Sequence, residues 1–350
     1  MYGGGAQRVA SRLANALVEN NEVTIVALEP SREIYALDER VRLLFLKEPV
    51  CKQFPVRGRF GAYLNYLCRF LDLRRQVKRI KLEERPDVAL SMLDRANLLN
   101  AFSRTKGCRT VTSERNNPRR KGKMYYLKGL LSYLKSDKVV SQSRTVMRQF
   151  PLLIRLKGVV VPNPIQVSCK ADGCSKRIVT MGRLNSQKNH TLLLKAFALF
   201  AKDHPLHTLQ IYGKSYDWDD IGYMHIINEL CLPDKVFLEG HQEDVHSLIA
   251  SAEQFVLSSD FEGTPNALLE AMMMGLPCIS TGFEGAKELF GDSEACCLTP
   301  VGDERSLAEA MSRLADDSEF RHRLACRGKS FAESFSVEKV IPQWLCVLFA

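Results

Sequence analysis

Patterns that indicate a small, cross-linked domain are missing from this sequence. Its eleven cysteines are an odd number, and no two of them have the CxxC spacing typical of metal and redox motifs. Neither a disulfide framework nor a structural zinc site is therefore expected. We interpret the cysteines as reduced thiols, most of them buried.

Long apolar runs are missing as well. No stretch approaches the roughly twenty apolar residues that a membrane-spanning helix needs, and no signal peptide is recognisable before Gly3. We therefore expect a cytoplasmic protein. The chain has 350 residues, 45% of them hydrophobic and 25% charged. This length exceeds what one ordinary core organises, so it predicts two globular domains.

Acidic residues are scarce in the first half of the chain. Residues 1–165 contain 32 Lys and Arg against 14 Asp and Glu, whereas residues 166–350 contain 17 against 26, and the net charge is +9. Zinc-finger, RNP-like and basic-zipper patterns are absent, so no nucleic-acid partner is expected. An anionic membrane surface is the candidate partner of the basic half, which would make the protein peripheral on the inner face of the cell membrane.

The segment 57–81 concentrates positive charge beside aromatic residues and leucines at helical spacing. Its cations include Arg74, Arg75, Lys78 and Arg79. Such a helix can lie in the headgroup region of a membrane. Alternatively, its apolar stripe packs on a sheet while its charges are solvated. The periodicity predicts the helix and leaves both alternatives open.

Short apolar strands alternate with helical patterns through both halves of the chain. The expected strands are 23–28, 41–46, 88–92, 110–113, 139–141, 159–161, 178–181, 209–212, 236–238, 255–257, 278–280 and 296–298. This alternation predicts parallel sheets with crossover connections, that is, two doubly wound Rossmann-like α/β domains. In such domains ligands bind at the carboxyl ends of the strands, and we expect the two domains to face one cleft.

The proline-containing segment VVVPNPI marks the domain boundary, because residues before proline favour extended backbone. We place an N-terminal, acceptor-binding domain at 1–163 and a C-terminal, nucleotide-binding domain at 164–335. A helix at 336–350 is expected to cross back to the N-terminal domain.

The stretch 258–281, SSDFEGTPNALLEAMMMGLPCIST, is the most informative part of the chain. It predicts a strand end, a loop, a short helix with Thr264 as N-cap and Pro265 as first residue, and the next strand. A helix N-terminus presents amides that favour phosphate. Glu262 and Glu270 bracket these amides and can accept hydrogen bonds from hydroxyls. Together they suit a nucleotide sugar; the plainer alternative is a capped helix with two solvated glutamates.

The sequence EGTPNALLE at 262–270, followed by AMMMGLP, resembles the donor-site motif of the retaining glycosyltransferases of family four, which have the two-domain GT-B fold. The resemblance implies that Glu270 holds the ribose hydroxyls and that Glu262 approaches the donor sugar. It also implies that the backbone between them meets the diphosphate. These donor-binding residues are Thr264, Pro265, Asn266, Ala267 and Leu268. Thr264 stands where many members have an aromatic residue.

A second segment, GRLNSQKNH at 182–190, supplies Arg183 and Lys188 near a helix start. Two cations there can offset the charge that develops on a leaving diphosphate; otherwise they are exposed surface charges. Family-four members resemble this segment closely, which implies that both cations act on the diphosphate. Arg183, Lys188 and Glu262 are thus the expected catalytic residues.

Three further clusters carry weaker signals. Gly4 and Gly5 belong to a glycine turn whose amides can approach a phosphate or sugar of the donor. His241 lies in a segment that resembles the family's nucleobase loop, or it is an ordinary surface histidine. Glu114 stands where many members carry a group that faces the donor sugar, although a strand-end salt bridge with Arg115 is the plainer interpretation.

Asp217-Trp218-Asp219 fits the Asp-x-Asp pattern that holds a divalent metal in the other large glycosyltransferase fold. No further hard ligands accompany it, and fixed cations are available at Arg183 and Lys188. We therefore expect neither a metal nor a cofactor.

These observations predict a retaining, metal-independent glycosyltransferase. It would move a sugar from a UDP- or GDP-sugar to a lipid-linked or glycan acceptor in cell-surface polysaccharide assembly, an expectation that depends on the resemblance. Two other classes remain open. A nucleotide-sugar epimerase of the same architecture needs no acceptor, and a binding protein would keep Glu270 without turnover.

The first strand of the N-terminal domain is expected to be missing. Family members place an apolar strand before the glycine turn, whereas here only Met1 and Tyr2 precede Gly3. That strand is central in a doubly wound sheet. We therefore expect either a natural product that begins roughly ten residues upstream, about a strand and its lead-in, or a damaged copy.

Overall fold

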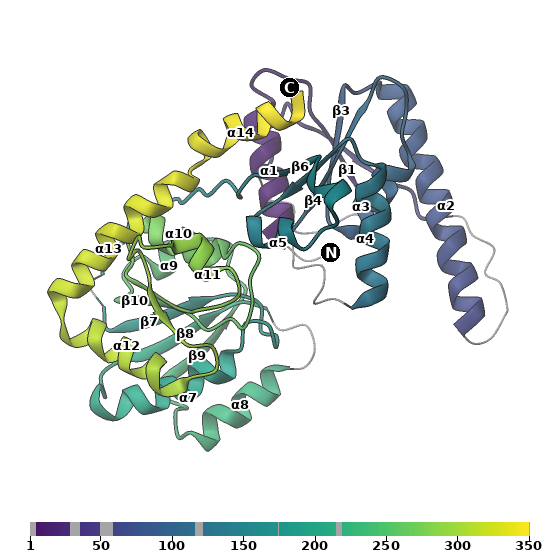
Figure 1. The fold of residues 1–350 in the computed structure, drawn as a ribbon. Coiled ribbons are helices and arrows are strands. Elements are labelled where there is room, and N and C mark those ends of the chain that lie inside the picture. Colours follow the sequence, from purple (N-terminus) through teal and green to yellow (C-terminus); the bar gives the residue numbers. More distant parts are fainter. Residues whose placement is uncertain are drawn as a thin grey trace. The chain divides into compact units, whose positions relative to one another are not determined.

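The computed structural model describes residues 5–28, 36–49, 59–115, 122–173, 175–214 and 219–349. The chain divides into two compact units (Figure 1). Unit 1 comprises Met1–Pro164 with Val337–Ala350, and unit 2 comprises Ile165–Ser336. The division therefore falls one residue from the boundary placed at the two prolines.

Unit 2 is a doubly wound α/β unit with one six-stranded parallel sheet in the order β12-β11-β10-β7-β8-β9. Its strands are β7 (Arg177–Met181), β8 (Thr208–Tyr212), β9 (Val236–Gly240), β10 (Gln254–Leu257), β11 (Cys278–Thr281) and β12 (Cys297–Thr299). Its helices are α7 (His190–Asp203), α8 (Asp219–Glu229), α9 (Val245–Ile249), α10 (Asn266–Met274), α11 (Ala286–Phe290), α12 (Glu304–Asp316) and α13 (Ser318–Ala332), and a 3-10 turn follows at Glu333–Phe335.

The sheet of unit 2 is buried on both faces, because neighbouring strand residues point to opposite sides. On one face Ile178 and Val256 contact a core that α7, α8 and α12 complete. On the other face Val179 and Phe255 contact a core built mainly from α9, α10 and α11. Strands buried on both faces read as continuous apolar runs, which is why they were recognisable in the sequence.

Unit 1 contains a four-stranded parallel sheet, β3-β4-β5-β6, and a separate parallel pair, β1-β2. Its strands are β1 (Thr24–Ala27), β2 (Arg42–Phe45), β3 (Val88–Met92), β4 (Arg109–Glu114), β5 (Lys138–Ser141) and β6 (Gly158–Val160). Its helices are α1 (Gly5–Leu17), α2 (Arg59–Glu84), α3 (Asp94–Phe102), α4 (Lys123–Lys135), α5 (Arg144–Arg148), α6 (Leu152–Arg155) and α14 (Val337–Phe349). All twelve expected strands are present, each with ends within two residues of the expectation.

Helix α1 joins the two sheets of unit 1 and is the first element among the described residues. Its Val9 and Leu13 pack with the four-stranded sheet and α14, whereas its Ala14 and Val18 pack with residues of the β1-β2 region. In α14, Trp344 is fully buried and its Nε1 donates to the carbonyl of Pro162 at 3.4 Å. The C-terminal helix thus completes the core of unit 1.

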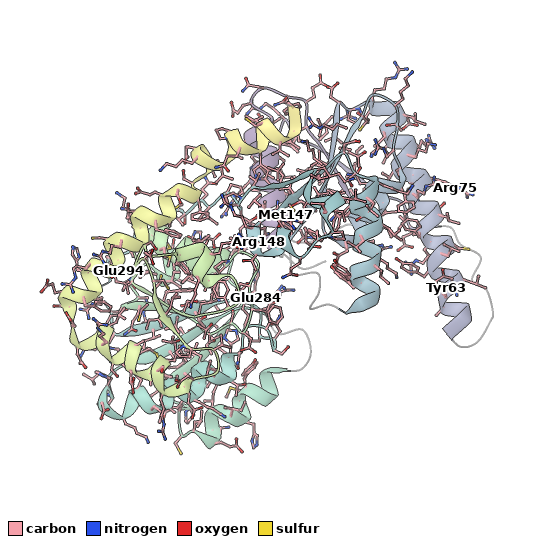
Figure 2. All side chains as sticks on the ribbon, viewed as in Figure 1. Tyr63, Arg75, Met147, Arg148, Glu284 and Glu294 are labelled. Atoms are coloured by element: carbon pink, nitrogen blue, oxygen red, sulfur yellow. The ribbon has the colours of Figure 1, made fainter. Side chains whose placement is uncertain are left out.

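Helix α2 is the long basic helix predicted from the sequence. Its middle and C-terminal turns pack inward, with Leu73 buried and Phe70 and Val77 beside it. Towards its N-terminus Tyr63 is 60% exposed, and Tyr63 and Arg75 project from the helix (Figure 2). The apolar stripe is therefore covered over one part of its length and solvent-exposed over the other.

Candidate active site

The strand order of unit 2 reverses at β7, which pairs with β8 on one side and with β10 on the other. In doubly wound sheets, ligands bind at such a switch point, outside the carboxyl ends of the two strands. We call the region between the loops that follow these two strands the crevice. The loops here are 182–189 after β7 and 258–265 after β10. They contain the three predicted catalytic residues, Arg183, Lys188 and Glu262.

Lys188 and Glu262 form an ion pair between these two loops. The distance from Lys188 Nζ to Glu262 Oε1 is 2.7 Å, and the side chains are 16% and 7% exposed. In a site with so little water the attraction is weakly screened, and the charged hydrogen bond is stronger than a neutral one. The pair brings together two of the three predicted catalytic residues.

Neutral donors fix the remaining lone pairs of the Glu262 carboxylate. Ser259 Oγ donates to Oε1 at 2.6 Å, and Gln187 Nε2 lies 3.4 Å from Oε2. Gln187 also donates to the carbonyl of Phe261 at 3.0 Å. A carboxylate with donors on both oxygens has few alternative rotamers, so Glu262 is held in one orientation.

Further hydrogen bonds tie the two loops together. Asn189 Nδ2 donates to Asp260 Oδ1 at 2.8 Å, and the amide of Asp260 donates to the carbonyl of Gln187 at 2.9 Å. Ser258 Oγ donates to the carbonyl of Lys188 at 2.9 Å. The crevice is therefore built on loops that support each other rather than on independent segments.

Helix α10 begins one residue later than predicted. Its N-cap is Pro265 rather than Thr264, and no side chain caps it; instead the amide of Asn266 donates to the carbonyl of Thr264 at 2.9 Å. Proline fits this position because it has no amide to satisfy and its φ of −80° is close to its preferred value. The backbone amides of Ala267 and Leu268 still lie at the predicted end of the helix, and the side chain of Leu268 is fully buried.

The end of α10 follows the prediction. Gly275 has a φ of 95°, which is a left-handed conformation that glycine adopts without steric cost, and its amide closes the last turn. Within the helix, the side chain of Glu270 is 2% exposed. Burial of a carboxylate destabilises the fold unless the carboxylate is hydrogen-bonded or charge-paired. A partner for Glu270 is therefore expected inside unit 2.

His246, at the start of α9, lies next to Glu270. Its Nε2 is 3.4 Å from Glu270 Oε2, and its Nδ1 is 3.4 Å from Ser168 Oγ. The imidazole therefore bridges a hydroxyl on one side and the buried carboxylate on the other. Glu270 can accept from hydroxyls through its remaining lone pairs, which suits it to a sugar diol.

Close backbone contacts shape the floor of the crevice. The amide of Gly182 donates to the carbonyl of Tyr212, and the amide of Gly213 donates to that of Gly240, so the ends of β7, β8 and β9 lie side by side. A Cβ at Gly213 would lie 1.7 Å from the carbonyl oxygen of Gly182. Only glycine fits there, and this close approach explains why Gly213 follows β8.

His190, the first residue of α7, lies directly behind Lys188. The imidazole is 1% exposed, and burial, with the charge of Lys188 adding to it, lowers the pKa of His190 to about 4. The ring contacts Tyr223 edge to face, with centroids 6.1 Å apart. A neutral histidine at this position adds no positive charge to the site near neutral pH.

The remaining predicted residues have diverse environments. Arg183 is exposed and makes no side-chain hydrogen bond or ion pair with residues that the structure describes, which leaves it available to a ligand. His241 is exposed after β9. Gly5 begins α1 in unit 1, and Gly4 lies outside the described residues. The predicted roles of His241, Gly4 and Gly5 therefore stay predictions.

Glu114 ends β4 in unit 1 and is only 2% exposed. Tyr133 donates its hydroxyl to Glu114 Oε2 at 2.5 Å, and burial together with this carboxylate raises the pKa of Tyr133 well above its usual value. Arg115 is buried as well; it donates to Asn163 and stacks over Trp344 at 5.1 Å. These contacts show that Glu114 is hydrogen-bonded inside unit 1. Its predicted part in positioning a donor stays a prediction.

Three residues of the crevice were not predicted from the sequence, namely Gln187, Ser259 and His246. Gln187 and Ser259 lie within recognised segments, but neither residue type signals a role by itself. His246 is one residue into a short helix, where a histidine is usually exposed. Its position opposite Glu270 depends on the packing of α9 against α10, which spacing along the chain does not reveal.

Among the described residues, no group of three or more His, Cys, Asp and Glu side chains is arranged to hold a metal ion. Asp217 and Trp218 lie outside them, and Asp219 begins α8. The helices that the structure describes include none whose length and apolar character would let it span a bilayer.

Two family models match the chain. Residues 3–168 match "Glycosyltransferase Family 4", and residues 175–317 match "Glycosyl transferases group 1". The two matches are separated by six residues, 169–174, and together cover most of unit 1 and of unit 2.

Relatives align over nearly the full length. The chain is 26% identical over 353 residues to a Campylobacter jejuni protein named GalNAc-alpha-(1->4)-GalNAc-alpha-(1->3)-diNAcBac-PP-undecaprenol alpha-1,4-N-acetyl-D-galactosaminyltransferase, with 98% of this chain and 94% of the relative covered. It is 24% identical to the lipopolysaccharide core biosynthesis glycosyltransferase LpsE of Rhizobium meliloti, with 99% and 96% covered.

Solved structures share the fold. Anabaena HepE in complex with UDP-glucose aligns with a TM-score of 0.77 at 17% identity, covering 99% of this chain and 97% of that one. The lipopolysaccharide outer core galactosyltransferase WaaB, in its apo form, aligns with a TM-score of 0.70, also at 17% identity, covering 98% and 95%. The predicted architecture of two Rossmann-like units is confirmed, and it is the GT-B fold.

Proposed function

Because the chain belongs to the family-four glycosyltransferases, we propose that it is a retaining enzyme that transfers a sugar from a nucleotide-sugar donor to a lipid-linked glycan acceptor. The donor would be a UDP- or GDP-sugar. The relatives named for an undecaprenol-linked acceptor and for lipopolysaccharide core synthesis support an acceptor used in cell-surface polysaccharide assembly. Being a glycosyltransferase follows from the family; the stereochemistry and the substrates are the proposal.

The observation that carries the proposal is the Lys188–Glu262 pair at the switch point, with Glu270 in the second turn of the following helix. The arrangement offers cations, helix amides and two carboxylates along one crevice. A phosphate is attracted to the amides and cations, and hydroxyls on either side of it meet the carboxylates. Few small molecules other than nucleotide sugars combine these groups.

Each residue then has a chemical task. Glu270, supported by His246, accepts hydrogen bonds from the ribose hydroxyls, and the amides of α10 receive the diphosphate. Arg183 and Lys188 stabilise the negative charge that grows on the departing diphosphate, so their contribution is largest in the transition state. Glu262 accepts from hydroxyls of the donor sugar and orients it.

Among the described residues of the crevice, Glu262 is the one candidate nucleophile for a covalent route to retention, and its carboxylate is already engaged: Lys188 and Ser259 both contact Oε1, and Gln187 lies 3.4 Å from Oε2. We propose a front-face reaction. The acceptor hydroxyl attacks the anomeric carbon on the side that the diphosphate leaves, and the leaving phosphate oxygen takes the hydroxyl proton. Protein cations provide the charge stabilisation, so the proposed reaction is independent of metal.

We place the enzyme in the cytoplasm, peripherally on the inner face of the cell membrane. The support is electrostatic: residues 1–165 carry 32 Lys and Arg against 14 Asp and Glu. An anionic surface attracts such a unit, and a lipid-linked acceptor would be available there.

The test is donor consumption with and without acceptor, followed by determination of the anomeric configuration of the product by NMR. We expect consumption that depends on acceptor, retention of configuration, and full activity in EDTA. Donor isomerisation without acceptor would indicate an epimerase, and binding without turnover would indicate a sugar-binding protein. Activity lost in EDTA and restored by manganese would contradict metal independence and direct attention to Asp217 and Asp219.

A further inference from the structure

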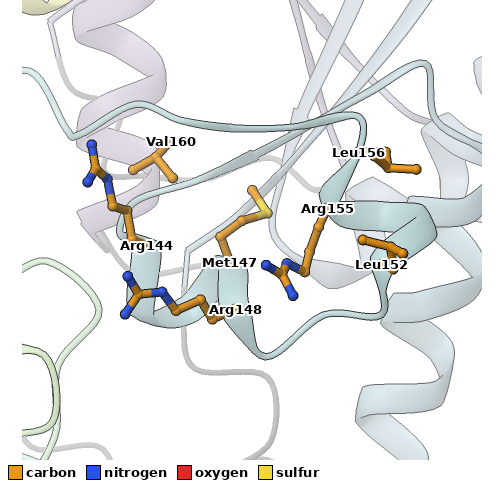
Figure 3. A pocket seen from close by; sticks show the side chains of 7 residues that line it. All are labelled: Arg144, Met147, Arg148, Leu152, Arg155, Leu156 and Val160. Atoms are coloured by element: carbon orange, nitrogen blue, oxygen red, sulfur yellow. The ribbon is translucent and has the colours of Figure 1, made fainter.

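Unit 1 contains a hollow of about 330 Å³ between α5, α6 and β6, whereas the predicted donor loops belong to unit 2. Arginine and apolar side chains share its walls, and Figure 3 shows Arg155 reaching from α6 towards Met147 on α5. Its lining residues are Arg144, Met147, Arg148, Leu152, Arg155, Leu156 and Val160. Guanidinium groups bind phosphate, while the aliphatic residues favour hydrocarbon. The lining of the hollow is thus chemically complementary to an amphiphile with an anionic head.

Exposed leucines extend the apolar part of the hollow over the neighbouring surface. On α6 and at its C-cap, Leu152, Leu153 and Leu156 are 65%, 69% and 75% exposed, and within this helix Ile154 alone is buried. Helix α4 packs against α6 and adds three more exposed leucines, namely Leu127, Leu131 and Leu134. We call these six residues the leucine surface. Six leucines left in water on two adjacent helices indicate an interaction site rather than ordinary surface scatter.

The leucines of α4 share one side of the helix because their spacing is four and three residues. The other side carries Tyr133, which is fully buried in the core with Ile154 and Phe150. Both α4 and α6 thus pack one face against the core of unit 1 and leave a second apolar face exposed to solvent. Apolar area of this kind is stabilised only when something other than water covers it.

The segment of chain that carries the leucine surface has almost only positive charges. Residues 122–164 contain eight Lys and Arg and a single acid, Asp137, and this acid is engaged by Arg104 at 2.6 Å. Arg148 and Arg155 are exposed and make no ion pair or hydrogen bond with residues that the structure describes. Within the described part of the chain, no carboxylate pairs with the two cations at the hollow.

Lys157 places its ammonium group at the edge of the leucine surface. Its Nζ donates to the carbonyls of Leu134 and Ser136 at the end of α4, at 2.8 and 2.6 Å. Partial burial lowers the pKa of Lys157. The lysine ties β6 to α4 and so holds the leucines of α4 beside those of α6.

We propose that the leucine surface and the arginine hollow dock unit 1 on an anionic phospholipid bilayer. The lipid phosphate occupies the hollow between Arg148 and Arg155, and the leucines enter the boundary between headgroups and acyl chains. Apolar insertion combined with attraction to anionic lipid is how interfacial helices bind. A nucleic acid would use the cations but would leave the leucines in water.

This proposal deepens the membrane association given under Proposed function and relocates it. Helix α2, the segment that the sequence suggested, pairs Arg79 with Glu83 and uses Arg74 to hold the carbonyl of Phe102. Its Leu73 is buried in the core. Part of the charge and part of the apolar stripe of α2 thus make contacts within unit 1. The six leucines of the leucine surface, by contrast, are exposed to solvent.

The test is co-sedimentation of the full chain with vesicles of phosphatidylcholine alone and of phosphatidylcholine mixed with phosphatidylglycerol, without donor or acceptor. We expect binding to the mixed vesicles only, and release as salt shortens the screening length to about 10 Å at 0.1 M. Arg148→Gln with Arg155→Gln should weaken binding about thirtyfold, the equivalent of about 1 kcal/mol for each cation near the surface. Leu152→Ser, Leu153→Ser and Leu156→Ser together should weaken it at least about tenfold.

Matched controls lie on unit 2. Leu206 is 72% exposed, so Leu206→Ser removes an equally exposed leucine. Lys202→Gln with Arg305→Gln removes two exposed cations from the same unit. Both controls should bind vesicles like the parent chain, and circular dichroism should show that every variant is folded.

The proposal would be overturned by unchanged vesicle binding in both the arginine variant and the leucine variant, by equal losses in the controls, or by a loss only after neutralising Arg74, Arg75, Lys78 and Arg79 on α2. Inorganic phosphate that released the chain from vesicles while the leucine variant still bound would assign the hollow to free phosphate and also contradict docking. The assay contains no substrate, so its failure is separate from a failure of the transferase proposal, which the donor-consumption test reports.

Discussion

Lys188 and Glu262 are 74 residues apart in the chain, yet Lys188 Nζ lies 2.7 Å from Glu262 Oε1. They meet because β7 and β10 are neighbours in the sheet and each residue lies in the loop that follows its strand. In this state the lysine neutralises the glutamate. A donor diphosphate would draw Lys188 towards itself and share its charge, so donor binding and the orientation of Glu262 are expected to be coupled.

The ion pair should show strong energetic coupling. Lys188→Met leaves a carboxylate that is 7% exposed without its cation, and we expect the free energy of unfolding to fall by about 3 kcal/mol. The double variant Lys188→Met/Glu262→Gln should be more stable than the sum of the single effects predicts, by roughly 1–3 kcal/mol. Urea unfolding of the four proteins measures this. Lys176→Met, at an exposed lysine of unit 2, should change stability by no more than about 0.5 kcal/mol; additive effects at the pair would contradict the coupling.

Nucleotide binding should depend on Glu270. Glu270→Ala removes a charged acceptor from two ribose hydroxyls, which predicts a loss of about 1.5–3 kcal/mol in affinity for the donor nucleotide. His246→Ala should weaken binding by a smaller amount, because His246 acts by orienting Glu270 across 3.4 Å. Calorimetric titration with the nucleotide measures both. Glu309→Ala, at an exposed glutamate on α12, is the control; equal affinity in Glu270→Ala and in this control would remove Glu270 from the site.

Arg183 should act on turnover rather than on folding. Its side chain is exposed, so Arg183→Ala should change stability by no more than about 0.5 kcal/mol. Turnover should fall about 10²–10³-fold with a smaller loss of donor affinity, because the charge on the leaving diphosphate is greatest in the transition state. Steady-state kinetics separates kcat from KM, and Arg183→Lys should recover part of the activity. Parallel losses in kcat and in donor affinity would argue for simple binding instead.

His190 should make stability depend on pH. Its pKa falls from 6.5 to about 4 on folding, so between these values the unfolded chain binds more protons than the folded chain. Stability from this residue is therefore full above pH 6.5 and declines as the pH falls towards 4, with a loss of about 2 kcal/mol between pH 7 and pH 5. Unfolding free energies at several pH values measure this slope. It should be shallower in His190→Gln; identical slopes in the two proteins would assign the pH dependence to other groups.

The sequence determined the elements and their order. Strands such as 178–181 and 255–257 are buried on both faces and therefore appear as short apolar runs, which patterning detects well. The start and end of α10 follow from a proline and a glycine with strong positional preferences, and the prediction was one residue early at Thr264. The segments 182–190 and 262–270 were also recognisable, because strand, loop and helix start are contiguous in the chain.

Tertiary structure decided which side chains meet. The contact of Lys188 with Glu262 requires the strand order that makes β7 and β10 neighbours, and that of His246 with Glu270 requires α9 to pack beside α10. The same holds for the surfaces. Helical periodicity in 57–81 and in 123–135 is visible in the sequence, but only packing shows that Leu73 is covered while Leu131 is exposed. Periodicity specifies one face of a helix, and the neighbouring elements, which may come from any part of the chain, specify what covers that face.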